Sequence, residues 1–595
     1  MDRVDDLALL RRFEPVLRLT AGEVFTPTSV ERYVASAQLL LAAGTPYAQV
    51  LVERGGLDPA GLATLGREYA DEPLSLRYVE RPMSFSEHRA WLRRGGRQRF
   101  RPISRAAAVG LLARFIAALM QLTLLVRGAV PGGWTAAAAE QARAADPDRR
   151  CTYYGRVSRD AGYVILQYWF LYPMNDWRSS FGGVNDHEAD WEQITVYVTD
   201  EPEPRPTWVA FSSHDEHGAD LRRRWDDPDL DRVGEHPVVY VGAGSHSGAY
   251  LPGEYLVTVA PELPRWIDAI RLTLARLSPW HEPGELTIGI PYIDYRRGDG
   301  LSIGPGQDEE WDAVVIDDDT PWVHDYRGLW GLDTRDRFGG ERAPAGPRYE
   351  RDGRVRQSWG QPIAWADLDA LPPTAEAARA LWEGRAATLG RRLAAVEAEL
   401  AVVRGHLREA TVAATVAGRT TTSSAAVVAA RRRTDELRQE QARLTSSLDE
   451  AERLAGLDVP VPPPHTHLRH RALPLDAARG SRVLGVWAAV SAALLMAILG
   501  GLLLANPTHL VSWSLAVLAG MIALESVLRG SLFTLVTRVV VTAAALVTVG
   551  VLVAFTVANI RVTAGILLVV TAAYLLVRTV LDALRNWVGE QEQAG

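Results

Sequence analysis

The sequence contains no lysine, so all 64 of its basic residues are arginine. This absence excludes enzymes that form a Schiff base on lysine and nucleotide-binding proteins with a phosphate-loop lysine. The sequence also has a single cysteine, Cys151, which excludes an intrachain disulfide and a cysteine cluster for zinc or iron–sulfur ligation. Any metal bound by this chain must therefore take its ligands from histidine and carboxylate side chains.

A basic surface is missing as well. The formal net charge is -8, and no long arginine run is interleaved with aromatic residues, which argues against nucleic acid as a partner. The first residues, Met1–Asp6, are acidic and lack the basic-then-apolar pattern of a secretory signal. We therefore expect the large N-terminal part to stay in the compartment where it is made.

With 595 residues, the chain is too long for one hydrophobic core. We expect a multidomain protein with a helical N-terminal region, an antiparallel β-sandwich, an α-helical coiled-coil hairpin and a C-terminal bundle of four transmembrane helices. The predicted boundaries are 1–150 for the helical region, 151–365 for the sandwich, 374–456 for the hairpin, 457–482 for a Pro/Arg-rich linker, 483–580 for the bundle and 581–595 for a tail.

Short β-prone runs separated by turn residues predict the sandwich. They lie at Tyr163–Tyr172, Asp190–Val198, Thr207–Ser213 and Pro237–Ala243. In the helical region, residues 106–126 are apolar enough to resemble a membrane span, although Arg114 interrupts them. We expect a buried or membrane-surface helix there, and a true span is the alternative.

Leucine and valine alternate at spacings of four and three between Leu389 and Leu407, which is the seam of a coiled coil. A second polar helix contains Leu437 and Leu444, and the residues between the two helices, 418–424, are typical of a bend. The two helices are expected to pair within the chain or between subunits of a homo-oligomer. The alternative is a solvated spacer with no specific partner.

Four apolar segments follow the linker, at 483–505, 510–528, 539–559 and 562–580. Arginines are concentrated before the first segment, between the second and third, and after the fourth. The positive-inside rule therefore places both termini and the whole N-terminal region in the cytoplasm. Charge inside the segments is sparse, with Glu525 near the end of the second, so we expect a multi-pass membrane anchor rather than an ion path.

The motif Asn185–Glu192 runs directly into a β-prone segment. In a strand, Asp190 and Glu192 share a face with the apolar residues Ile194, Val196 and Val198. Carboxylates on such a face are costly unless they are protonated, paired with arginine or histidine, or bound to a cation. The motif therefore predicts a cation site, and an ion-pair network with arginines such as Arg178 is the alternative.

Histidines can complete this site. His187 and Glu188 come directly before the strand, and His214 and His246 each follow an apolar β-prone run. Oxygen ligands with one or two imidazoles suit a divalent cation such as calcium, magnesium, manganese or zinc. The predicted metal ligands are Asp190, Glu192, His187, His214 and His246, and the candidates for a general base are His187 and Glu188.

Several segments resemble the vacuolar protein sorting-associated protein 62 family, over roughly residues 10 to 350. That family typically shows a His-x-Gly-Asp-Trp-Glu core followed by a Ser-His segment. Here the core is His187–Glu192, with Ala189 in place of the glycine, and Ser245-His246 follows it. The other matching segments are Phe13–Val16, Phe25–Val30 and Gln167–Pro173.

The same motif is more distantly similar to the His-Arg-His-Asp-Trp-Glu motif of necrosis-inducing cytolysins, which lies on a β-sandwich and helps to bind a divalent cation. This resemblance implies that His187, Asp190 and Glu192 are ligands. Cytolysins are secreted proteins with disulfides, whereas this chain has one cysteine. Their toxin activity is therefore not carried over.

Three functions stay open. The leading hypothesis is a membrane-anchored, cytoplasm-facing β-sandwich protein with a divalent-cation site that acts in membrane-associated binding or organisation. The second is a metal-dependent hydrolase of a lipid or glycan, with His187 or Glu188 as general base. The third is a structural, oligomerising membrane protein that works through its coiled coil.

Overall fold

The structure is a computed structural model, and it describes most of the chain. The described residues are 3–43, 46–94, 109–126, 133–145, 150–176, 186–212, 218–259, 288–332, 343–369, 371–417, 425–457, 482–505, 508–533 and part of 536–578. The chain forms two compact units. One comprises Met1–Arg105 and Ala117–Ala478, and the other comprises Ala106–Ile116 and Arg479–Gly595.

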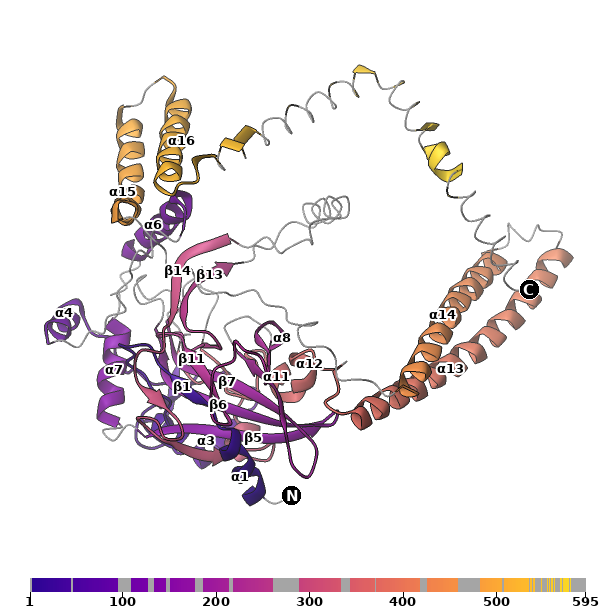
Figure 1. Cartoon of the computed structure of the whole chain (residues 1–595), viewed down its shortest axis with the longest axis horizontal. Coiled ribbons are helices and arrows are strands. Elements are labelled where there is room, and N and C mark those ends of the chain that lie inside the picture. Colours follow the sequence, from indigo (N-terminus) through magenta and orange to yellow (C-terminus); the bar gives the residue numbers. More distant parts are fainter. Residues whose placement is uncertain are drawn as a thin grey trace. The chain divides into compact units, whose positions relative to one another are not determined.

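A six-stranded sheet with the order β16-β5-β6-β7-β8-β9 is the centre of the first unit (Figure 1). Neighbouring strands are antiparallel except for β16, which is parallel to β5. All residues of the long strand β6 are buried, because both faces of this sheet are covered. The strands are β5 (Cys151–Asp160), β6 (Tyr163–Asn175), β7 (His187–Thr199), β8 (Pro206–Phe211), β9 (Arg223–Arg224) and β16 (Trp311–Val315).

A second sheet packs on one face of the first. Leu17 and Val239 of the second sheet share an apolar core with Tyr168 and Val196 of the first, which is the arrangement of a β-sandwich. Helix α1 (Arg3–Phe13) contributes to the same core. The strands of the second sheet are β10 (Arg232–Val233), β11 (His236–Val241), β1 (Val16–Arg18), β15 (Ser302–Ile303) and β12 (Gly248–Ala249).

The other face of the central sheet is covered by a small α/β layer. Its side chains, such as Tyr33 and Leu39, share a core with Trp169 and Trp191 of the sheet. The layer contains β2 (Gln38–Leu41), β3 (Gln49–Val52), β4 (Leu74–Arg77), α2 (Val30–Ala35), α3 (Pro59–Glu68), α4 (Phe85–Arg93), α7 (Gly133–Ala145) and α10 (Pro321–Asp325). Short helices α8 (Gly218–Leu221), α11 (Gln357–Gly360) and α12 (Pro362–Trp365) and the ribbon β13 (Gly253–Val259) and β14 (Ile288–Arg296) complete the unit.

The predicted strand runs are confirmed as β6, β7, β8 and β11. The prediction of a mainly helical region over residues 1–150 is only partly right, because four strands, β1 to β4, lie within it. These strands are three or four residues long, too short to show a clear period of two. Strand β1 pairs with β11 and β15, so the sandwich draws on residues before the predicted boundary at 151.

Two long helices, α13 (Ala375–Val416) and α14 (Ala425–Ala455), lie side by side (Figure 1). Val396, Leu400 and Leu437 form the buried centre of their contact. Ion pairs join Arg392 to Glu440 at 2.7 Å and Arg433 to Glu399 at 2.6 Å, and this pairing makes the helices antiparallel. The predicted bend at 418–424 lies outside the described residues.

The second unit contains α15 (Arg482–Ala505) and α16 (Leu510–Leu528), together with the start of α6 (Leu111–Val126). Residues 483–505 and 510–528 are two helices long and apolar enough to cross a membrane. Four such helices were predicted. The third and fourth segments, 539–559 and 562–580, fall on residues that are described only in part, and the tail 581–595 and the linker residues 458–481 lie outside the described residues.

Candidate functional site

The regular alternation of side chains between the two faces of β7 is interrupted at Ala189, which has a φ of 55°. Regular alternation would place Glu188 and Asp190 on the same face of the sheet. Instead, Glu188 is bonded to residues of the α/β layer, whereas Asp190 is bonded to a loop of the second sheet. The left-handed residue therefore separates two neighbouring carboxylates onto opposite faces.

Asp190 lies on the sandwich face, as its pattern predicted. Its cross-strand partner is Tyr172, and both belong to the face that carries Ile194, Val196 and Val198. His246, in the turn after β11, donates from Nδ1 to Asp190 Oδ2 at 2.9 Å. The imidazole is stacked on the ring of Tyr172 with centroids 3.9 Å apart, and the amide of Asn175 donates to the same oxygen of Asp190 at 3.1 Å.

A second carboxylate approaches His246 from the loop before α2. Glu23 Oε1 lies 3.6 Å from His246 Nε2. Backbone N–H groups of Val24, Phe25 and Gly244 donate to the Glu23 carboxylate, so its position is fixed by the loop. His246 is therefore held between two carboxylates from distant parts of the sequence.

Two further aspartates lie beside the end of β6 and the start of β7. Asp176 directly follows Asn175 at the end of β6, and Asp186 directly precedes His187 at the start of β7. Asp186 is buried and Asp176 is half-buried, and like charge from Glu23 and Asp186 acts on Asp176. We call Glu23, Asp176, Asp186, Asp190 and His246 the acidic cluster.

The ionisable side chains of the acidic cluster change one another's pKa values. Burial by itself would lower the pKa of His246, but hydrogen bonds and charge from Asp190 and Glu23 raise it to about 10. Burial opposes ionisation of Glu23, yet His246 and the backbone donors lower the pKa of Glu23 below its ordinary value. The pKa of Asp176 is raised well above its ordinary value by burial and then by Glu23 and Asp186.

Glu188, a candidate general base, has a different environment. Its two carboxylate oxygens accept four N–H groups: those of Tyr78 and Val79 at 2.8 Å, the indole of Trp134 at 3.0 Å and Leu332 at 3.1 Å. The residue has no exposed surface, and burial raises the pKa of Glu188 to about 7 against these four hydrogen bonds. The geometry makes Glu188 a structural carboxylate that ties β7 to the α/β layer, away from the acidic cluster.

The other predicted site residues are placed as follows. His187 is opposite Asn175 and so lies on the same side of the sheet as Asp190. Its Nδ1 donates to the carbonyl oxygen of Ala189 at 2.7 Å, which leaves Nε2 as the acceptor of the neutral ring. Glu192, two residues after Asp190 on β7, accepts a hydrogen bond from Ser212 Oγ at 2.8 Å. His214 lies outside the described residues.

Sequence reasoning missed Glu23, Asp176 and Asp186. The hairpin register could have indicated the two aspartates, because they flank the β6–β7 connection. The residues around Glu23 in the sequence do not indicate that it belongs to a site. Within the described residues, no group of three or more histidine, cysteine or carboxylate side chains is arranged as a metal-ligand set, so a cation would have to draw the carboxylates of the acidic cluster closer together.

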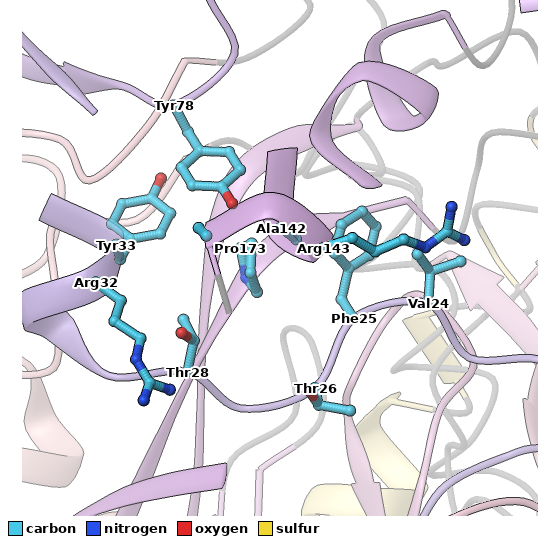
Figure 2. A pocket seen from close by; sticks show the side chains of 11 residues that line it. Val24, Phe25, Thr26, Thr28, Arg32, Tyr33, Tyr78, Ala142, Arg143 and Pro173 are labelled. Atoms are coloured by element: carbon cyan, nitrogen blue, oxygen red, sulfur yellow. The ribbon is translucent and has the colours of Figure 1, made fainter. Parts of the chain in front are cut away.

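A small pocket lies beside the loop that carries Glu23. Figure 2 shows its lining residues, with the paired rings of Tyr33 and Tyr78 on one side and the side chains of Arg32 and Arg143 pointing away from each other. The two tyrosine rings are stacked with centroids 4.9 Å apart. The free volume is about 40 Å³, enough for a water molecule or two but not for an organic substrate.

No family model matches the chain, and no curated protein matches it. One solved structure that it matches is the crystal structure of non-toxic HaNLP3 protein, with 20% sequence identity and a TM-score of 0.13. The match covers 16% of this chain and 40% of that chain.

Proposed function

We propose that this chain is a membrane-attached protein whose β-sandwich binds a divalent cation at the acidic cluster and acts in membrane-associated binding or organisation. The acidic cluster carries the proposal. Four carboxylates, those of Glu23, Asp176, Asp186 and Asp190, gather around one imidazole. These side chains bring oxygen donors from three separate segments of the sequence to one place.

The ligand chemistry is compatible with a hard cation. The donors are carboxylate oxygens, together with Asn175 Oδ1, a buried oxygen with no hydrogen-bond partner in the part of the chain that the structure describes. Oxygen-rich sets of this kind suit calcium, magnesium or manganese. His187 can add an imidazole from the same side of the sheet, with its ring held by the carbonyl of Ala189.

Membrane attachment is supported by α15 and α16, whose apolar stretches are 23 and 19 residues long. Side chains such as Val486, Val511 and Leu515 are more than half exposed on these helices, which is costly in water. We propose that all four apolar segments anchor the chain and that the sandwich faces the cytoplasm, as the arginine distribution predicts.

Cation binding is tested by thermal unfolding of the full-length protein in detergent, with EDTA and then with calcium, magnesium, manganese or zinc. A bound cation stabilises the folded state by about 2.7 kcal/mol at one hundred times its dissociation constant, so the melting temperature should rise. In Asp190→Asn this rise should disappear, because one carboxylate of the acidic cluster loses its charge.

The matched control is Glu14→Gln, which neutralises another buried carboxylate outside the acidic cluster. This variant should melt at a lower temperature than the wild type but keep the cation-dependent rise. Equal melting temperatures of the wild-type protein with EDTA and with every cation would reject the cation site.

A further inference from the structure

Helix α6 begins in the second unit, against the two apolar helices. Leu111 of α6, Leu495 of α15 and Met521 of α16 form a buried cluster. Phe115, one turn farther along α6, packs against the same cluster. A segment from the N-terminal half of the sequence therefore completes the packing of the α15–α16 pair.

An ion-pair network fixes this contact. The guanidinium of Arg114 is paired with Glu525 near the end of α16, and both side chains are about 95% buried. Arg529 donates to the other oxygen of Glu525 at 2.8 Å and to the carbonyl oxygen of Val109 at 2.7 Å. The indole of Trp487 also donates to Glu525, at 3.3 Å.

This network lies where α15 begins and α16 ends, since Trp487 is near the start of α15 and Arg529 directly follows α16. Arginine and tryptophan are typical of the headgroup level of a membrane. The apolar cluster that Leu111 and Phe115 join also includes residues away from that end of α15 and α16, such as Ile498 and Val517.

A second side of α6 is apolar and exposed. Leu112, Ile116 and Leu119 are 53%, 50% and 43% exposed, and their spacings of four and three place them on one face. On α15, Val486, Val490 and Leu494 form an exposed apolar row of the same kind. Helix α6 and the candidate membrane span α15 therefore both expose a row of aliphatic side chains.

The segments on the two sides of α6 fold into one core. Leu39 and Tyr78, before α6, pack in the same cluster as Ala136 and Ala139 of α7, after it. Because the chain before and after α6 belongs to one folded body, α6 cannot pass from one side of a bilayer to the other. This argument excludes the predicted alternative of a true membrane span at 106–126.

We infer that α6 is a re-entrant helix that enters the bilayer from the side of the β-sandwich, docks on α15 and α16 through Arg114 and Glu525, and presents Leu112, Ile116 and Leu119 to lipid acyl chains. The inference rests on the proposed membrane attachment of α15 and α16. It gives the sandwich a second point of attachment to the membrane, independent of the linker at 457–482.

The test uses the full chain with Cys151→Ser, reconstituted in vesicles of phosphatidylcholine and phosphatidylglycerol. Single cysteines placed by Ile116→Cys and by Val490→Cys are labelled with a bimane fluorophore, and quenching by lipids with a doxyl group on the acyl chain is measured. We expect Ile116 to be quenched as strongly as Val490. A label placed by Tyr47→Cys, at an exposed site of the α/β layer, should show no quenching.

The ion pair is tested in the same assay. Arg114→Glu should abolish quenching at position 116 and leave quenching at position 490 unchanged, and adding Glu525→Arg should restore it. Quenching at 490 without quenching at 116 would overturn the re-entrant helix and leave membrane attachment intact. Absence of quenching at both positions would overturn the proposed attachment and, with it, this inference.

Discussion

Glu188 and Asp190 are two residues apart on the same strand, and the chain stabilises their carboxylates in opposite ways. Glu188 faces the α/β layer, where four N–H groups donate to it. Asp190 faces the second sheet, where it is paired with His246. The first arrangement offers every lone pair a donor, whereas the second pairs the carboxylate with an ionisable side chain.

The difference separates a structural carboxylate from a candidate ligand. Hydrogen bonds from backbone N–H groups stabilise a charge only while the surrounding loops stay folded. A change at Glu188 should therefore affect the stability of the fold. A pair with histidine can be exchanged for a pair with another cation, because imidazole gives up its proton. Glu188, the histidine partner of Asp190 and the residue between the two carboxylates can each be changed separately.

Glu188→Gln should have the largest effect on stability. The amide group would direct its own N–H groups at two of the four donors, so the free energy of unfolding should fall by about 3 kcal/mol. Denaturant unfolding of the full chain in detergent measures the change. The loss should be the same with EDTA and with divalent cations, because Glu188 lies outside the acidic cluster.

The control for this variant is Glu203→Gln on the exposed loop between β7 and β8, which should unfold like the wild type. If Glu188→Gln kept wild-type stability but lost cation-dependent stabilisation, the assignment of Glu188 as structural and of Asp190 as a ligand would have to be reversed.

His246 predicts a pH dependence. Its pKa is raised to about 10 in the folded protein and is about 6.5 in the unfolded chain. The folded state therefore holds a proton that the unfolded state releases between these values, and stability is lost as pH rises through this window. The pH-dependent loss attributable to His246 should be on the order of 2 kcal/mol or more between pH 6.5 and 9, measured with EDTA present.

His246→Gln should flatten this slope, because glutamine does not titrate. His324→Gln, which changes an imidazole that is about half exposed, should leave the slope unchanged. An equal slope in the wild type and in His246→Gln would mean that the charge of Asp190 is balanced by some other group.

The motif was informative because its chemistry and its strand are local. The β-prone run at 190–198 predicted both the strand and the face shared by Asp190 and Ile194, and the structure confirms that face. His246 was a predicted partner because it follows an apolar run. Glu23 could not be predicted, since only the parallel pairing of β1 with β11 brings its loop to His246.

The membrane region shows the same limit. Composition alone identified the apolar stretches at 483–505 and 510–528 and the similar stretch at 106–126. It could not show that Arg114 and Glu525, which are 411 positions apart, are partners. A buried charge in each segment indicates that a counter-charge is needed, but the sequence does not say where that counter-charge lies.

Ala189→Gly should have the smallest effect, and its sign tests the separation of the two carboxylates. Alanine at a φ of 55° is strained by about 1–2 kcal/mol, part of which is offset by the greater freedom of glycine in the unfolded chain. Glycine at this position should therefore stabilise the protein by about 0.5–1 kcal/mol in denaturant unfolding. Ala210→Gly in the buried strand β8 should instead destabilise it by about 1 kcal/mol or more. If Ala189→Gly destabilised the protein to the same extent, β7 would be regular at this position, and Glu188 and Asp190 would lie on the same face of the sheet.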